Sequence, residues 1–394
     1  MEKKTARLYF VDAMRAWAIL MMLQGHFIDG LLDPVFRDNS NITFTVWKYF
    51  RGITAPVFFT VSGFIFTYLL IKVPQWGWQN PRVSKGIKRG LQLLFIGYLL
   101  RANLFGILKG QVYKTFFLVD VLHCIGLSLL GIIGIYLLAH RTKKTLLPVM
   151  LLGVTLFLFL FEPIYSQWTF EFLPQALANF LTRDNGSVFT IIPWFGYTTF
   201  GAFLSVVFTR YREHRFLYPY AISLCLLTGT ALIFYSSWIF MQLTYLTGIP
   251  LFRAIADNNY LFIRLGDVFV VFAMFMLFRR MMVNATLLKI GQSTLSIYII
   301  HFIILYGSFT GLGLYRIFHH GLNPTAAISG ALIFMFICSY TALRYEKNKA
   351  TINAGLAFTV KTMNKHLISA YSITQRLAKV YVLKLLRSVR LLKS

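Results

Sequence analysis

Ten apolar runs, each about 20 residues long, constrain the fold of this chain more than any other feature. Only helices and closed barrels satisfy every backbone hydrogen bond inside a bilayer, and roughly 20 apolar residues let a helix cross it. Hydrophobic residues make up 57% of the chain and charged residues 13%, against roughly 25% charged in soluble domains. The sequence therefore predicts an all-α, polytopic membrane helix bundle with spans at 10–32, 52–73, 89–108, 119–139, 145–162, 188–208, 217–239, 261–279, 288–310 and 325–344.

The distribution of charge predicts how these spans are oriented. Lysine and arginine clusters precede the first span and follow the second, fourth, sixth and eighth, whereas most acidic residues lie in the alternate loops. Loops rich in lysine and arginine stay in the cytoplasm, so both termini are expected there. The formal net charge of +26 is thus explained by topology and by anionic lipid headgroups, and it does not indicate a nucleic-acid partner.

Two regions are expected along the chain. Residues 1–345 form the predicted transmembrane domain, and residues 346–394 form a basic cytoplasmic tail. In the second half of the tail apolar and basic side chains alternate, which is typical of an amphipathic helix lying on anionic lipid. The first apolar run has no small-residue cleavage site, so we interpret it as a span and not as a signal peptide.

The first span contains four ionisable side chains that hydrocarbon disfavours: Asp12, Arg15, His26 and Asp29. Eleven helical steps of about 100° place Arg15 and His26 on one face, roughly 16 Å apart. Each basic residue has an acid three positions away, on much the same stripe. A purely structural explanation, with a snorkelling arginine and a hydrogen-bonded histidine, accounts for the two ends of this stripe. It does not account for polar side chains along the whole segment. The pattern therefore favours a functional site that faces the bundle interior.

Further candidate residues lie in other spans. Asp120 and His123 are three positions apart at the start of the fourth span, where a carboxylate beside a histidine fixes the imidazole tautomer. Two additional arginines, Arg51 and Arg101, are expected near the outer ends of the second and third spans. The remaining candidates, expected to support the site, are Asp12, Ser62, Asp120, His123, Tyr298 and His301.

No metal site or redox chemistry is expected. The sequence has no HxxxH, HExxH or CxxC spacing. Each of its three cysteines, Cys124, Cys225 and Cys338, lies in a different apolar run. Three widely spaced cysteines of this kind do not indicate a disulfide framework.

The stripe in the first span suits a group transfer across the membrane. A guanidinium near the cytoplasm pairs well with the phosphates of a long donor, and a histidine farther out can act as a general base. Because pantetheine is about as long as the Arg15–His26 separation, an acyl-CoA is the natural donor. The alternative is a proton-coupled transporter or exporter of a small anionic metabolite, although no inverted repeat or selectivity filter is visible.

Several segments resemble a known family. The Arg15-to-His26 spacing, with FFTVSGF in the second span, is similar to the transmembrane acyltransferase superfamily, which includes the acyltransferase-3 proteins. The fuller pattern resembles the branch that contains the YeiB-type proteins and heparan-alpha-glucosaminide N-acetyltransferase. The segments that carry this resemblance are VDAMRAWAILMMLQGHFID, FRGITAPVFFTVSGF, VDVLHCIGLSLLGI, IPWFGYTTFGAFL and IGQSTLSIYIIH.

The resemblance implies a membrane enzyme that passes an acyl group, usually acetyl from acetyl-CoA, to a hydroxyl or amine of a glycan or other cell-envelope acceptor. His26 matches the essential histidine of the family and Arg15 the matching arginine, whereas Ala16-Trp17 departs from the usual glycine. Acetyl-CoA is expected as a co-substrate, with no permanently bound cofactor. We expect a bacterial cytoplasmic membrane as the location. The acceptor and the oligomeric state, a homodimer included, stay open.

The candidate residues have expected roles in catalysis and in donor binding. His26 is expected to be the general base, and Asp29 or Asp120 to stabilise its imidazolium form. The expected donor-binding residues are Arg15, Arg51 and Arg101. A transient acyl-histidine intermediate is the alternative chemistry.

Overall fold

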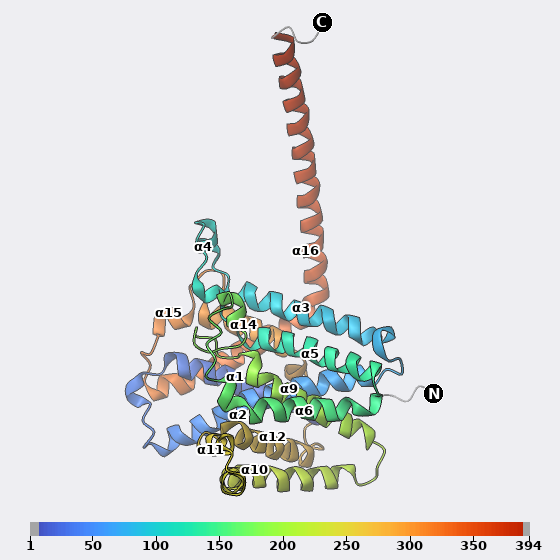
Figure 1. Ribbon diagram of the computed structural model, residues 1–394. Helices are drawn as coiled ribbons and strands as arrows, with labels where there is room; N and C mark the ends of the chain where they lie inside the picture. Colours follow the sequence, from blue (N-terminus) through green and yellow to red (C-terminus); the bar gives the residue numbers. More distant parts are fainter. Residues whose placement is uncertain (1–7, 389–394) are drawn as a thin grey trace. The chain divides into compact units, whose positions relative to one another are not determined.

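The computed structural model describes residues 8–388, which are helical over most of their length (Figure 1). The long helices are α1 (Tyr9–Leu31), α2 (Ile42–Ile71), α3 (Pro81–Arg101), α5 (Val121–Arg141), α6 (Leu147–Leu160), α9 (Ile191–Arg210), α10 (Leu217–Thr247), α12 (Tyr260–Leu277), α14 (Thr294–Tyr306) and α16 (Pro324–Ser388). The short helices are α4 (Leu104–Leu108), α7 (Glu162–Tyr165), α8 (Gln175–Ala178), α11 (Pro250–Asp257), α13 (Ala285–Gln292) and α15 (Leu314–Phe318). Within the described residues β-pairing is limited to two isolated bridges, Leu32–Leu322 and Asn103–Phe309.

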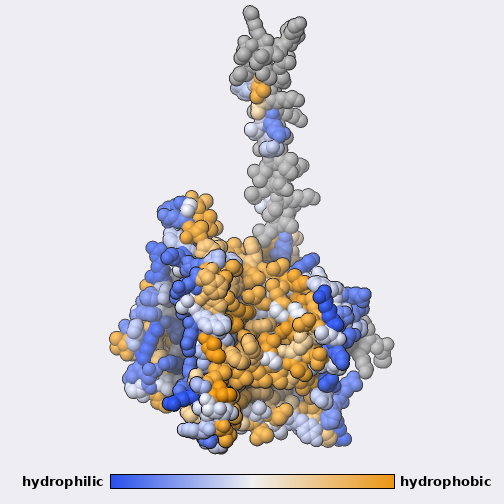
Figure 2. All heavy atoms as spheres, in the orientation of Figure 1, coloured by the Kyte–Doolittle hydropathy of each residue, from blue (hydrophilic) through white to orange (hydrophobic). Residues whose placement is uncertain are grey.

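The helices have the length and composition of membrane spans. Among the described residues, six are long and apolar enough to cross a bilayer, and the bent pair α13–α14 makes seven if it counts as one span. In the part that contains residues 8–341, Figure 2 shows a broad hydrophobic zone with hydrophilic residues gathered toward its two edges. The chain is therefore a multi-pass integral membrane protein with an all-α fold, as the sequence predicts.

Three of the ten predicted spans are not among the helices that are long and apolar enough to cross a bilayer. They coincide with α1, α3 and α6: the first two carry ionisable side chains, and α6 is only 14 residues long. The ninth predicted span, 288–310, is not one straight helix, because α13 and α14 meet at Ser293 with a bend of 71°. At the end of α13, a Cβ on Gly291 would overlap the carbonyl oxygen of Asp12, so the backbones of α13 and α1 are in direct contact.

Local sequence signals start several of these helices. The side chain of Asn41 accepts hydrogen bonds from the backbone amides of Thr43 and Phe44, and Asn284 caps α13 in the same way. Asn80 caps α3 and is followed by Pro81 at the first helical position, where proline is well tolerated. The Asn41 cap starts α2 ten residues before the predicted span at 52–73.

Helices α2 and α9 pack with their backbones in contact. A Cβ on Gly63 of α2 would overlap the carbonyl oxygen of Thr198, and a Cβ on Gly201 of α9 would overlap that of Thr60. Small residues allow such close packing in membranes, where dispersion contacts between helices replace the hydrophobic effect as a driving force. This pair of glycines fixes α2 against α9 at the centre of the bundle.

The chain divides into two compact units between Thr341 and Ala342. The second unit is described as helix through Ser388. The last six residues of the predicted tail, 389–394, and the basic cluster at Lys3, Lys4 and Arg7 lie outside the described residues.

Replacing Gly201 by valine is expected to destabilise the protein. The new side chain would force the α2 and α9 backbones apart, and overpacking of this kind costs about 1–3 kcal/mol or more. The thermal unfolding midpoint in detergent measures the effect. Gly134→Ala is the matched control, because a Cβ at Gly134 of α5 meets nothing within 4 Å. Equal midpoints for Gly201→Val and the control would contradict the packing argument.

Candidate active site

A cavity of about 870 Å³ lies beside the C-terminal end of α1, within the size range of small-molecule sites. Its wall is built from α1, α2, the end of α3, the start of α5, the second half of α14 and the loops between them. Six of the residues expected from the sequence line this one cavity: His26, Asp29, Arg51, Arg101, Asp120 and Tyr298. Three separate regions of the sequence therefore meet here.

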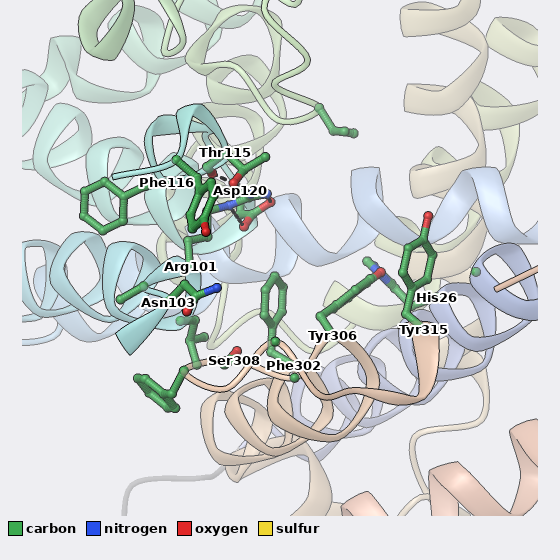
Figure 3. A pocket seen from close by; sticks show the side chains of 18 of the residues that line it. His26, Arg101, Asn103, Thr115, Phe116, Asp120, Phe302, Tyr306, Ser308 and Tyr315 are labelled. Atoms are coloured by element: carbon green, nitrogen blue, oxygen red, sulfur yellow. Dashed lines mark hydrogen bonds and ion pairs between the residues drawn. The ribbon is translucent and has the colours of Figure 1, made fainter. Parts of the chain in front are cut away.

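The imidazole of His26 is held by a tyrosine. Its Nδ1 lies 2.7 Å from the hydroxyl oxygen of Tyr306, at the end of α14, as Figure 3 shows. A ring nitrogen engaged in this way fixes the orientation of the imidazole and leaves Nε2 as the other reactive position. The structure thus gives His26 a hydroxyl partner, where the sequence suggested a carboxylate.

A second histidine packs against the first. The ring centroid of His301 lies 5.4 Å from that of His26 and 4.8 Å from that of Tyr298, in edge-to-face arrangements. His301 is fully buried and is not among the residues that line the cavity. It therefore packs behind His26, against the cavity-lining rings of Tyr298 and Phe302.

Asp29 and Arg51 form an ion pair between α1 and α2. Their side chains are 33% and 45% exposed, so the pair lies on the open side of the cavity. The stem of Arg51 passes beside Gly25, where a Cβ would lie 3.4 Å from Arg51 Cγ, in ordinary van der Waals contact. The carboxylate of Asp29 is therefore occupied by a guanidinium and not by the imidazole of His26.

Asp120 and Arg101 form a tighter pair between α3 and α5. Nε and Nη2 of Arg101 each lie 2.6 Å from one carboxylate oxygen of Asp120, and Nη1 donates to the carbonyl of Thr115 at 3.0 Å (Figure 3). Such a bidentate pair is geometrically specific. His123 supports it from behind, because its Nδ1 accepts the backbone N–H of Asp120 at 3.1 Å.

Arg15 lies away from this cavity. Its Nη2 donates to Thr294 Oγ1 at 3.0 Å, at the start of α14, and its Nη1 lies 3.8 Å from Asp12 Oδ1. Neither Arg15 nor Asp12 is among the cavity-lining residues. Arg15 and His26 thus both contact α14, and of these two side chains only that of His26 lines this cavity.

Ser62 also lies outside the cavity wall. Its hydroxyl donates to the carbonyl of Phe58 at 2.7 Å, one turn earlier in α2. A hydroxyl bonded to its own helix is a common structural arrangement in apolar helices.

Sequence reasoning missed several residues of the cavity wall. Tyr306 is the most important of them, and Asn103, Thr115, Phe302 and Tyr315 also line the cavity. A tyrosine at the end of an apolar run is ordinary at a membrane interface, so Tyr306 carried no separate signal. Asn103 and Thr115 belong to loops whose path only the folded chain defines.

Residues 7–240, more than half of the chain, match the family described as heparan-alpha-glucosaminide N-acetyltransferase, catalytic. The chain belongs to this family. It is a family of membrane acyltransferases that use acetyl-CoA as the acetyl donor, so the resemblance expected from the sequence is confirmed and the protein is an acetyltransferase. A search of curated proteins gave no match.

The region that matches the heparan-alpha-glucosaminide N-acetyltransferase family contains some of the cavity-lining residues but not those of α14. His26, Arg51, Arg101 and Asp120 fall inside residues 7–240, whereas α14 follows later in the chain. Tyr306, which holds His26, is therefore supplied by a segment beyond the matched region.

Replacing Asp120 by asparagine is expected to lower stability clearly. Removing one partner of a half-buried, bidentate pair leaves the Arg101 charge uncompensated, and we expect a loss of about 1–3 kcal/mol, below the range for fully buried pairs. The control is Asp257→Asn, which breaks the exposed Arg253–Asp257 pair and should change stability little. Thermal unfolding midpoints measure both. If Asp120→Asn were as mild as the control, the Arg101–Asp120 pair would not hold α3 to α5.

Proposed function

We propose that this protein transfers an acetyl group from cytoplasmic acetyl-CoA to an amine or hydroxyl of a glycan or similar cell-envelope acceptor, with His26 as the general base. The observation that carries the proposal is the position of His26: it lines a cavity of suitable size, in a member of an acetyl-CoA-dependent family, with Nδ1 hydrogen-bonded to Tyr306. The family description names an N-acetyltransferase acting on a glucosaminide, so an amino sugar is the first acceptor class to test.

The chemistry needs one base in neutral form. If Nδ1 of His26 carries the ring proton and donates it to Tyr306, the lone pair of Nε2 faces the acceptor. The acceptor nitrogen or oxygen attacks the thioester carbonyl, its proton moves to Nε2, and the carbon–sulfur bond breaks. The released thiolate then takes the proton from His26, which yields free CoA thiol and restores the neutral base.

The charges on the cavity wall favour a neutral or amine-bearing acceptor. Each cavity arginine is balanced by a carboxylate, Arg51 by Asp29 and Arg101 by Asp120, so no uncompensated cation is offered to an anionic sugar. Aromatic rings that include Phe116, Phe302 and Tyr315 line the same space and provide apolar faces for the C–H groups of a sugar ring.

The donor is proposed to enter from the Arg15 end of α1. Of the three arginines expected to bind it, only Arg15 lies outside the cavity, and its contact with a carboxylate is the loosest of the three, since Asp12 is 3.8 Å away. Arg51 and Arg101 are reassigned to the acceptor side because their charges are already paired. Transfer then requires a passage between Arg15 and His26, and the bend between α13 and α14, next to Arg15, is where we propose that it opens.

This mechanism fits ten spans with both termini in the cytoplasm. In α1 the ionisable side chains contact other helices, so a low mean hydropathy does not prevent that helix from crossing the bilayer. We assign residues 1–345 to the acyltransferase domain and 346–394 to a basic cytoplasmic tail. The proposed location is a bacterial cytoplasmic membrane.

His26→Ala should abolish transfer. Loss of a positioned general base typically lowers the rate by about 10²- to 10⁴-fold. Membranes containing the protein are given acetyl-CoA and a glucosamine-terminated oligosaccharide, and release of CoA thiol is measured together with acetylated product. His140→Ala, an exposed histidine at the end of α5, is the control. Unchanged thiol release in His26→Ala would overturn the assignment of His26 as the base.

Tyr306→Phe should slow the reaction without weakening substrate binding. The substitution keeps the aromatic packing with Phe302 and removes only the hydroxyl that holds His26. One hydrogen bond contributes roughly 0.5–1.5 kcal/mol, so kcat should fall about 2- to 13-fold with KM nearly constant. Steady-state kinetics measures both constants, and the unfolding midpoint checks the fold. A rise in KM alone would indicate a role in acceptor binding instead of positioning.

A further inference from the structure

Two apolar hollows lie beside the C-terminal end of α9. The first, here called the α6 groove, has a volume of about 470 Å³ and runs between α6 and α9. The second, the α10 groove, has about 400 Å³ and is enclosed by α1, α2, α9, α10 and α12. Val207 and Tyr211 line both grooves, so the end of α9 forms the wall between them.

Both grooves are remote from the cavity that contains His26. That cavity includes Phe189, next to the start of α9, whereas the grooves lie at the other end of this 20-residue helix. At a rise of about 1.5 Å per residue the two ends are roughly 30 Å apart. The grooves are therefore not part of the proposed active site.

Cations gather where the two grooves meet. Arg210 lines the α6 groove, and the loop from 210 to 215 contains three arginines against one glutamate, Glu213. Within the described part of the chain, neither Arg210 nor Arg212 forms a salt bridge. Burial and the nearby positive charge of Arg212 both lower the pKa of Lys72. The rim is thus a cluster of positive charges without matching carboxylates.

Aromatic rings connect these charges to the α10 groove. The guanidinium carbon of Arg279 lies 3.9 Å from the ring centroid of Tyr218, and its Nη1 donates to the carbonyl of Met276. The Tyr218 ring in turn packs against Phe10 and Phe208, which line the groove. Arg279 is thereby held at the polar end of an apolar hollow.

We propose that this region binds one anionic glycerophospholipid, with its phosphate on Arg210 and Arg212 and one acyl chain in each groove. Membrane helices gain little from apolar contact with lipid alone, so two apolar hollows do not by themselves select a lipid. Selection comes from the positive rim, because each arginine near an anionic headgroup adds roughly a fivefold preference. The pair of grooves on either side of one cationic rim matches the two chains and single headgroup of such a lipid.

Lipid binding by the purified full-length protein tests the proposal. Native mass spectrometry from detergent micelles compares dioleoylphosphatidylglycerol with dioleoylphosphatidylcholine, and the anionic lipid should bind about fivefold more tightly or better. Arg210→Gln combined with Arg212→Gln should remove this preference. Lys85→Gln combined with Lys88→Gln loses the same charge from exposed positions on α3 and should keep it. Glycerol phosphate is added as a competitor and should not displace the lipid.

A second pair of variants tests the groove separately from the charge. A Cβ at Gly153, which lines the α6 groove, meets nothing within 4 Å, so Gly153→Leu fills the groove without moving a helix. It should reduce binding of the anionic lipid severalfold, whereas Gly134→Leu, also in open space, should not. Equal binding of the two lipids, an arginine variant that behaves like the lysine control, or displacement by glycerol phosphate would each overturn the proposal.

Discussion

The structure depends on how one apolar helix satisfies its ionisable side chains. Three such groups in α1 that hydrocarbon would reject have a partner on another helix: Arg15 bonds to Thr294, His26 to Tyr306 and Asp29 to Arg51. Two of these partners are on α14 and one is on α2. These contacts bring α2 and α14 against α1, and those made by His26 and Asp29 lie in the wall of the cavity.

Close backbone packing supplies the rigidity that these polar contacts need. Gly63 and Gly201 bring α2 against α9, and Gly291 brings α13 against α1. Because a membrane offers little hydrophobic force between helices, such contacts carry much of the packing energy. They also set the position of Arg51 on α2 and the point at which α14 leaves α13, and both contribute to the cavity.

The two ends of the bundle have different chemistry. Around His26 each arginine is matched by a carboxylate, and aromatic rings and hydroxyls complete the wall, which suits a small acceptor of low charge. At the far end of α9, Arg210 lines an apolar groove and forms no salt bridge with any described residue, which suits the anionic lipid that we propose.

The sequence by itself determined the membrane class, the helical content and the family. Apolar runs and the R-x10-H spacing are local properties of the sequence, and they can be recognised without knowing which helices pack together. Six of its candidate residues line one cavity, because hydrocarbon disfavours most of these polar side chains unless they face a cavity or a partner helix.

Only the tertiary structure decided how those residues pair. Helical periodicity put Asp29 near His26, yet the carboxylate went to Arg51, since a guanidinium on the facing helix offers a stronger charge partner. Likewise Tyr306, 280 positions from His26, became its partner through the packing of α14 on α1. Contacts between distant segments depend on which helices meet and at what depth, and no local pattern encodes that.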